Sequence, residues 1–231
     1  MNENSVAAFV LAGGESSRMG RDKALVPFAG RPLIVRALAT LREAGCDPAI
    51  AGARTALART TLESYAAVIP DPAPASAAVS GPLAGICAAM TSTTARWCVF
   101  LPVDLPLLPA SLLVCLVRRA QLIDAPVTLV SVNGFAQTFP AVLDRAVLPL
   151  LQAELDAGRN GCFAAFRAAA SSLGRPLSIV PAEFLIQSGQ TAHPAALPAI
   201  CWFFNVNTPG DLGRAETLIA RHGALDCVSW N

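Results

Sequence analysis

Short apolar runs that end abruptly at glycine or proline are the feature that most constrains the fold of this chain. The first run, Ala7–Leu11, is uniformly apolar and leads into the pair Gly13 and Gly14. Such a run is typical of a strand buried on both faces, which a parallel sheet requires. The segment Pro32–Ala44 follows with apolar residues at helical spacing and stops at Gly45, so we predict a helix there.

This alternation of strand-like and helix-like segments continues along much of the chain. We predict further strands over Asp47–Ala51, Ala66–Ile69, Trp97–Pro102, Val127–Val132 and Gln137–Val142, and helices over Arg54–Ser64, Leu83–Thr91 and Pro109–Leu122. Asn133 and Gly134 are expected to form the turn between the last two strands. The succession predicts a doubly wound α/β sheet with right-handed crossovers, in a single domain over residues 1–231. Residues 171–199 are less regular and receive no assignment.

Charge, cysteine spacing and hydropathy exclude several classes of protein. The 231 residues carry a formal net charge of +1, which favours binding neither to nucleic acid nor to a membrane surface. The seven cysteines are dispersed without a C-x-x-C pair, which argues against a disulfide framework or a structural zinc site. The apolar stretch 99–117 is interrupted by Asp104 and three prolines, and Glu3 does not suit a signal peptide. We therefore expect a cytoplasmic protein.

Ligands of such sheets bind beyond the carboxyl ends of the strands, and the loop after the first strand has unusual chemistry there. It reads G-G-E-S-S-R-M-G-R-D-K from Gly13 to Lys23. Glycine amides can approach an anion closely, and the hydroxyls of Ser16 and Ser17 add donors. Arg18 and Lys23 can neutralise phosphates. The spacing is neither that of a dinucleotide fingerprint nor that of a P-loop, so a flexible surface loop remains the alternative.

A second loop holds one carboxylate in an otherwise apolar stretch, L-P-V-D-L-P. Asp104 follows the predicted strand that ends at Pro102, and the flanking prolines fix the direction of the chain. A carboxylate at this position suits a hard cation such as Mg²⁺. The alternative is a cap for the helix that begins near Pro109, but that helix lies five residues further on. We therefore favour the metal.

A third loop, F-F-N-V-N-T-P-G-D-L, alternates asparagine with valine. This alternation puts Asn205 and Asn207 on one face of an extended segment. Thr208 before Pro209 is typical of a helix cap, and Asp211 can share in it, but capping does not account for the two asparagines. Contact with a metal shell or a phosphate and a purely structural role both remain open.

Weaker signals come from a lone acid, a helix entry and two histidines. Asp71 follows another predicted strand, and Gly81 precedes a helix whose N-terminus can receive an anion or a polar base edge. The two histidines, His193 and His222, are expected to be structural or exposed rather than catalytic.

Together these stretches resemble the bacterial molybdenum cofactor guanylyltransferase family. The matching stretches are L-A-G-G-E-S-S-R-M-G-R-D-K-A, S-G-P-L-A-G-I, P-V-D-L-P and F-N-V-N-T-P-G-D-L, in the family's order. The resemblance implies a three-layer αβα Rossmann-like nucleotidyltransferase fold with a mostly parallel sheet. It also implies transfer of GMP from GTP to the terminal phosphate of molybdopterin or its molybdenum-loaded form, with Mg²⁺ as cofactor and release of pyrophosphate. Further partners would be other cofactor-biosynthesis proteins or acceptor enzymes.

The same resemblance assigns roles to individual residues. The residues implied to bind the nucleotide are Leu11, Ala12, Gly13, Gly14, Lys23, Asp71 and Asp104. The implied catalytic residues are Arg18, Lys23 and Asp104, with Asp104 as the Mg²⁺ ligand. Additional contacts are expected from Ser16, Ser17, Gly81, Asn205 and Asn207. The segment Gln137–Pro140 only loosely resembles the family's Gln-Pro segment, and residues 171–199 match nothing in it.

Three alternatives to guanylyl transfer remain. A molybdopterin cytidylyltransferase or a sugar-phosphate nucleotidyltransferase would keep the fold and metal but select another base or acceptor. The Gly-Gly pair of the opening motif is closer to the guanylyl members, because the cytidylyl relatives typically read Ala-Ala-Gly. A non-catalytic adaptor that binds a nucleotide or cofactor is disfavoured by Arg18, Lys23 and Asp104, because an adaptor has little need of a metal carboxylate.

Overall fold

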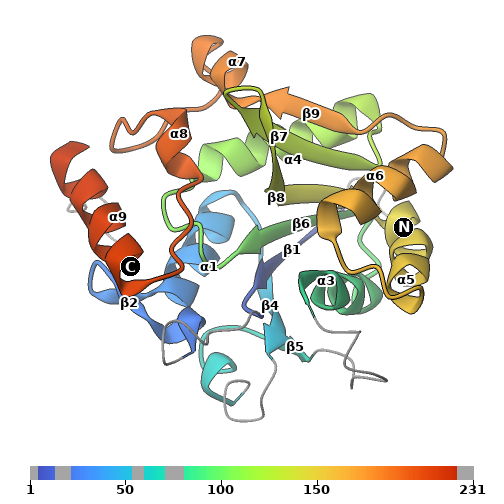
Figure 1. Cartoon of the computed structure of the whole chain (residues 1–231), viewed down its shortest axis with the longest axis horizontal. Coiled ribbons are helices and arrows are strands. Elements are labelled where there is room, and N and C mark those ends of the chain that lie inside the picture. Colours follow the sequence, from blue (N-terminus) through green and yellow to red (C-terminus); the bar gives the residue numbers. More distant parts are fainter. Residues whose placement is uncertain (1–4, 14–21, 54–59, 71–80, 223–231) are drawn as a thin grey trace.

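A seven-stranded sheet forms the middle layer of the computed structural model, which describes residues 5–13, 22–53, 60–70 and 81–222 (Figure 1). The strand order is β5-β4-β1-β6-β8-β7-β9. The strands are β1 (Val6–Leu11), β4 (Pro48–Ala53), β5 (Val68–Pro70), β6 (Trp97–Pro102), β7 (Val127–Val132), β8 (Phe135–Asp144) and β9 (Ser178–Pro181). Only β8 runs antiparallel to its neighbours in this sheet, so the predicted mostly parallel α/β fold is confirmed. A separate hairpin joins β2 (Pro27–Phe28) to β3 (Arg31–Pro32).

Helices cover both faces of the sheet and complete the three predicted layers. They are α1 (Leu33–Glu43), α3 (Pro82–Thr91), α4 (Ala110–Ile123), α5 (Leu148–Asp156), α6 (Cys162–Ser172), α7 (Ala182–Gln187), α8 (Ala199–Trp202) and α9 (Pro209–His222), with 3-10 turns η2 (Lys23–Leu25) and η4 (Arg145–Val147). Helices α1 and α4 contribute to one hydrophobic core and α3, α5 and α6 to the other. In the described ranges, no helix is long and apolar enough to cross a membrane.

The first strand is buried on both faces, as its uniform apolar sequence predicts. Ala8 and Val10 pack into the core beneath α1 and α4, whereas Phe9 and Leu11 pack into the core beneath α3. The ring of Phe9 stacks on that of Phe100 in β6, with centroids 5.4 Å apart. Because β1 lies between two parallel neighbours, β4 and β6, its carboxyl end is held at a fixed place in the sheet.

The predicted elements occur in the structure with ends shifted by at most two residues where they are described. Asn133 and Gly134 both have positive φ, of 50° and 80°, as a type I′ hairpin turn between β7 and β8 requires. The helix predicted over Arg54–Ser64 lies partly outside the described residues, and residues 60–62 are helical. The unassigned stretch contains β9 and α7, which are too short to give a periodic pattern.

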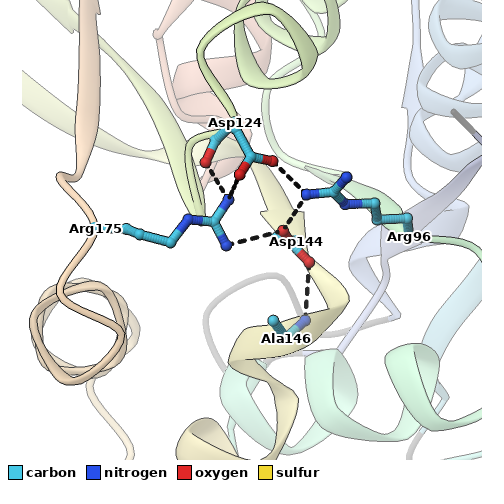
Figure 2. A network of polar contacts seen from close by, with 5 residues as sticks. All are labelled: Arg96, Asp124, Asp144, Ala146 and Arg175. Atoms are coloured by element: carbon cyan, nitrogen blue, oxygen red, sulfur yellow. Dashed lines mark hydrogen bonds and ion pairs between the residues drawn. The ribbon is translucent and has the colours of Figure 1, made fainter. Parts of the chain in front are cut away.

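A network of two arginines and two aspartates holds the carboxyl end of β8 (Figure 2). One carboxylate oxygen of Asp144 lies 3.2 Å from Arg96 Nη2 and 3.3 Å from Arg175 Nη1. The other accepts a hydrogen bond of 2.9 Å from the amide of Ala146. Asp124 at the end of α4 pairs with both guanidinium groups. The network thus joins the start of β6, the end of α4 and the segment before β9 to the end of β8.

Candidate active site

A cavity of about 460 Å³ opens at the carboxyl ends of β1 and β6. Residues from three predicted site segments line it: Leu11, Ala12 and Gly13 at the end of β1, Asp104 after β6, and Asn205 and Asn207 before α9. Lys23 in η2 completes this side of the cavity. The loops that the sequence singled out therefore meet at one place, where an open α/β sheet binds its ligands.

Lys23, Asp104 and Asn207 form the polar centre of the cavity. The ammonium of Lys23 lies 3.0 Å from Oδ2 of Asp104 and donates a hydrogen bond of 2.6 Å to Oδ1 of Asn207. The side chains of Lys23 and Asp104 are 17% and 25% exposed, so a ligand in the cavity can reach both charges. Lys23 is also the single lysine in the sequence, a signal that composition alone contains.

Backbone contacts place these side chains. The carboxylate of Asp22 caps η2 by accepting a 3.0 Å hydrogen bond from the amide of Ala24. The amide of Val103 donates to the carbonyl of Leu11, and the amide of Val206 donates to the carbonyl of Asp104. These bonds continue β1–β6 pairing past the strand ends and attach the third loop to the second.

The capping alternative for Asp104 is wrong. The N-cap of α4 is Pro109, which makes no side-chain capping hydrogen bond, and Asp104 instead faces Lys23. A carboxylate at this strand end is therefore available to a ligand rather than used by the following helix.

The third loop behaves as the alternation of asparagine and valine predicts. Val206 is fully buried, whereas Asn205 and Asn207 are exposed and line the cavity. Thr208 and Asp211 form a reciprocal cap for α9: the Asp211 amide lies 3.2 Å from Thr208 Oγ1, and the Thr208 amide lies 2.9 Å from Asp211 Oδ2. Hydrogen bonds, first from the Thr208 side chain, lower the pKa of Asp211. The cap fixes the loop that presents the asparagines.

Gly13 has a packing reason to be glycine in addition to any role in anion binding. A Cβ on this residue would lie 2.8 Å from the carbonyl oxygen of Gly52 in β4, closer than real Cβ atoms come. The preceding residue, Ala12, donates to the carbonyl of Ala51 at 2.9 Å. The loop therefore leaves the sheet directly against the backbone of β4, and only glycine fits this approach.

Strand β8 supplies a wall of the cavity that the sequence analysis did not assign. Ala136, Gln137, Thr138 and Phe139 all line it. Beyond Phe139, residues 140–143 of β8 are buried and apolar, so Gln137 and Thr138 stand out as polar residues in the half that faces the cavity. That change of polarity along one strand was the available signal. From α3, the residue that lines the cavity is Pro82, and Gly81 is the exposed residue before the helix, with φ of 138°.

Several predicted site residues cannot be placed. Gly14, Ser16, Ser17, Arg18 and Asp71 lie outside the described residues.

The donor atoms around Asp104 fit Mg²⁺. Within the described ranges, no group of three or more His, Cys, Asp or Glu side chains gathers to form a metal cage. The described lining of the cavity instead offers one carboxylate, Asp104, and the amide groups of Asn205 and Asn207. Mg²⁺ is commonly held by one or two carboxylates together with substrate phosphates, and it prefers oxygen ligands. This set of oxygen atoms matches that mode of binding.

No histidine or cysteine lines the described part of the cavity. Burial, together with the nearby Arg36, lowers the pKa of His193 to about 4, and its Nδ1 accepts from the amide of Ala195. Burial raises the pKa of Cys87 and Cys98 to about 12, so these thiols stay protonated at neutral pH. None of these three residues lines the cavity. Its described part therefore offers charge and oxygen ligands but no histidine or cysteine.

Comparison with protein families identifies one that covers most of the chain. A family described as the MobA-like NTP transferase domain matches residues 8–173. A molybdenum cofactor guanylyltransferase from Rhizobium meliloti (strain 1021) is 33% identical over 217 residues, which cover 90% of this chain and 89% of that protein. One from Xanthomonas euvesicatoria pv. vesicatoria (strain 85-10) is 41% identical over 113 residues. That match covers 48% of this chain and only about half, 53%, of the relative.

Solved structures share the fold at low sequence identity. Molybdopterin-guanine dinucleotide biosynthesis protein A from Archaeoglobus fulgidus aligns with a TM-score of 0.71 and 21% identity, covering 93% of this chain and 99% of that one. The 2-C-methyl-D-erythritol 4-phosphate cytidylyltransferase from Thermus thermophilus aligns with a TM-score of 0.61 and 16% identity, covering 94% and 99%. These likenesses support the fold and leave the choice of base and acceptor to other observations.

Proposed function

This chain belongs to the MobA-like NTP transferase family, and we propose that it transfers GMP from GTP to molybdopterin or its molybdenum-loaded form, with release of pyrophosphate. The observation that carries the proposal is the meeting of Lys23, Asp104 and Asn207 in one cavity at the strand ends. Relatives at 33–41% identity that are named molybdenum cofactor guanylyltransferases support guanine as the base and the molybdenum cofactor as the acceptor. The proposal includes a cytoplasmic location, where GTP is available.

The proposed reaction requires the protein to position the phosphates and to neutralise their negative charge. Nucleotidyl transfer is an in-line substitution at phosphorus, and negative charge spreads over the phosphate oxygens in the transition state. The proposed nucleophile is a terminal phosphate of the acceptor, which is already ionised at neutral pH. No general base is required, in agreement with a described cavity lining that holds no histidine.

Lys23 has the role of a fixed cation in this scheme. Its ammonium is held by Asp104 and Asn207 at the wall of the cavity, where the triphosphate would lie. A preorganised cation needs little rearrangement as charge develops, which is how such groups lower a barrier. Leu11, Ala12 and Gly13 would hold the nucleoside beside it.

Asp104 would hold Mg²⁺, with Asn205 and Asn207 as neighbouring oxygen donors. When bound, Mg²⁺ supplies neutralisation of phosphate charge and orientation of the leaving pyrophosphate. Asp104 itself keeps its carboxylate at the strand end, and its backbone contact with Val206 keeps the asparagine loop beside it.

The test is a pyrophosphate-release assay with GTP, CTP, ATP and UTP, each with and without molybdopterin. We expect release with GTP that depends on both molybdopterin and Mg²⁺. Preference for CTP would assign a cytidylyltransferase, and turnover with a sugar phosphate in place of molybdopterin would assign a sugar-phosphate nucleotidyltransferase. Tight binding of GTP without release under all these conditions would favour the adaptor alternative.

A further inference from the structure

Arg36 does not line the cavity, but it contacts both segments that carry the ion pair between Lys23 and Asp104. Its Nε donates a hydrogen bond to the carbonyl oxygen of Pro106, two residues after Asp104. Its guanidinium also lies over the ring of Phe28, with Cζ 5.2 Å from the ring centroid. Phe28 ends β2, shortly after the turn η2 that carries Lys23. One side chain therefore connects the Lys23 segment to the Asp104 loop.

The helix that carries Arg36 is a rigid base for these contacts. Leu33, Ile34 and Leu38 of α1 are almost completely buried in the core. The amide of Leu33 donates to the carbonyl of Val26 at 3.0 Å, which ties the start of α1 to the chain between Lys23 and Phe28. Because α1 is fixed in this way, the position of Arg36 sets how far apart its two partners lie.

A polar side chain at this place is costly and needs a reason. Arg36 is partly buried, and burial lowers its pKa despite the attraction of Glu43. A guanidinium that is withdrawn from water loses hydration, and an apolar side chain would fill the same space without that loss. The gain from arginine is geometric, because a planar donor can bond a carbonyl while its face packs on an aromatic ring.

His193 supports the same loop from a second direction. The backbone of Leu107, which follows Pro106, lies near the His193 ring and favours its charged form against the larger effect of burial on its pKa, and that ring lies 6.3 Å from the Trp202 ring. The loop before α8 is itself attached to α4, because Ser111 Oγ lies 2.7 Å from Thr191 Oγ1. Two consecutive residues of the Asp104 loop, Pro106 and Leu107, thus lie beside side chains from distant parts of the chain.

We propose that Arg36 is a positioning residue, which sets the separation of Lys23 and Asp104 by holding Phe28 and the Pro106 carbonyl together. It does not reach the reacting atoms; Arg36 acts through the two segments that present the charges. The inference rests on the proposed function for its kinetic readout, and on the geometry of the metal and triphosphate site for its binding readout.

The experiment compares Arg36→Met, Arg36→Lys and a matched control, Arg42→Met. Arg42 lies on the same helix and also donates to a backbone carbonyl, that of Tyr65 at 3.3 Å. This contact is remote from the site, because neither Arg42 nor Tyr65 lines the cavity. Each variant is assayed for kcat, for the KM of GTP and for the Mg²⁺ concentration that gives half-maximal rate. Binding of Mn²⁺ and of GTP is measured separately, without acceptor, by titration calorimetry.

We expect Arg36→Met to lower kcat by about tenfold to a hundredfold, because small misplacements of reacting groups have effects of this size. It should also raise the half-maximal Mg²⁺ concentration and weaken Mn²⁺ binding several-fold. Arg36→Lys should recover part of both losses, and Arg42→Met should match the unmodified protein. If Arg36→Met does not fold, as judged by circular dichroism, the same measurements on Arg36→Lys test the proposal: a lowered kcat and weakened Mn²⁺ binding relative to Arg42→Met support it.

A folded Arg36 variant with unchanged kcat, Mg²⁺ requirement and Mn²⁺ affinity would overturn the proposal, even if it unfolds at a lower temperature. Failure of the proposed function looks different, because the unmodified protein would then release no pyrophosphate with any nucleotide. In that case the Mn²⁺ and GTP titrations still test Arg36: weaker binding in Arg36→Met than in Arg42→Met supports the positioning role, and equal binding overturns it.

Discussion

The ammonium of Lys23 lies 3.0 Å from the carboxylate of Asp104, although 81 residues separate them in the chain. Both side chains are partly buried at the wall of the cavity, and the loss of hydration of two such charges offsets much of their attraction, so the pair adds little net stability to the fold. Stability therefore gives little reason to bring these two charges together. A site that needs a cation and a metal ligand next to one triphosphate gives a direct reason.

Replacing the carboxylate of Asp104 tests the metal role. We expect Asp104→Asn to reduce the rate of pyrophosphate release about a thousandfold, since loss of a metal ligand removes several kcal/mol of transition-state stabilisation. Circular dichroism should show an intact fold, because Asp104 caps no helix. Asp124→Asn, an exposed carboxylate outside the cavity, is the control. Turnover of Asp104→Asn within tenfold of the control would remove Asp104 from this role.

The single lysine permits a chemical test that needs no substitution. An amine-directed acylating reagent should modify Lys23 and the terminal amino group only, because the sequence has no other lysine. We expect GTP with Mg²⁺ to slow modification of Lys23, read by mass spectrometry of its peptide, because a bound triphosphate would cover the ammonium.

Lys23→Met extends that test to kinetics. Loss of one preorganised positive donor should lower kcat/KM by about a hundredfold. The terminal amino group serves as the internal control for labelling. Equal labelling of Lys23 with and without nucleotide, together with unchanged kcat/KM in Lys23→Met, would contradict contact with phosphate.

Most strands and helices between β1 and β8 could be predicted from sequence because their signals are local, whereas the hairpin β2–β3 and the helices α5 and α6 were not predicted. Uniform apolar runs mark strands such as β1 and β6, and the Asn133-Gly134 pair marks the one hairpin that makes β8 antiparallel. The convergence of the site loops also followed, since the carboxyl ends of adjacent parallel strands lie at one edge of a sheet. Asp104 was predictable for this reason. Asn207 follows helix α8 rather than a strand, and it lies beside Asp104 because the amide of Val206 donates to the Asp104 carbonyl.

Other parts of the site depend on contacts that no local pattern encodes. Gln137 and Thr138 reach the cavity only because β8 inserts between β6 and β7, a matter of sheet order. The close approach of Gly13 to Gly52 depends on the register between β1 and β4. Arg36 has no distinguishing sequence signal within its amphipathic helix, because its contact with the Pro106 carbonyl appears only in the folded chain.

Asp144 should contribute to stability and not to catalysis. Its side chain is 5% exposed and lies between Arg96 and Arg175, at the end of β8 away from the cavity (Figure 2). Asp144→Asn should lower the free energy of unfolding by about 2 kcal/mol, the size expected for hydrogen bonds to charged groups. Asp124→Asn, which is 59% exposed, should lower it by less than about 1 kcal/mol. Urea unfolding measures both, and equal effects would contradict the importance of burial.

Gly13→Ala tests the contact between the β1 loop and β4. The added Cβ would lie 2.8 Å from a backbone oxygen, so the strands must move apart, and we expect a loss of about 1–3 kcal/mol in stability. Gly213→Ala is the matched control, because its Cβ would meet open space in α9 and a helical alanine should stabilise by up to about 1 kcal/mol. Thermal unfolding compares the two. A Gly13→Ala protein as stable as the unmodified one would show that the β1–β4 approach can relax freely.

His193 should make stability fall as the pH decreases below 6.5. Its pKa is about 4 in the folded protein, against an ordinary value of 6.5, mainly because burial disfavours the charged ring. Between these values the unfolded chain binds a proton that the folded chain does not, so acid favours unfolding. With allowance for partial exposure, the loss of unfolding free energy from pH 6.5 to pH 4 should be about 2 kcal/mol.

We expect urea unfolding at several pH values to show a smaller loss in His193→Gln than in the unmodified protein. His222→Gln, which removes the exposed second histidine, should change the dependence much less, because the charge of His222 is the smallest of the influences on the pKa of His193. Parallel pH curves for His193→Gln and the unmodified protein would mean that the folded state accommodates a charged ring at this position.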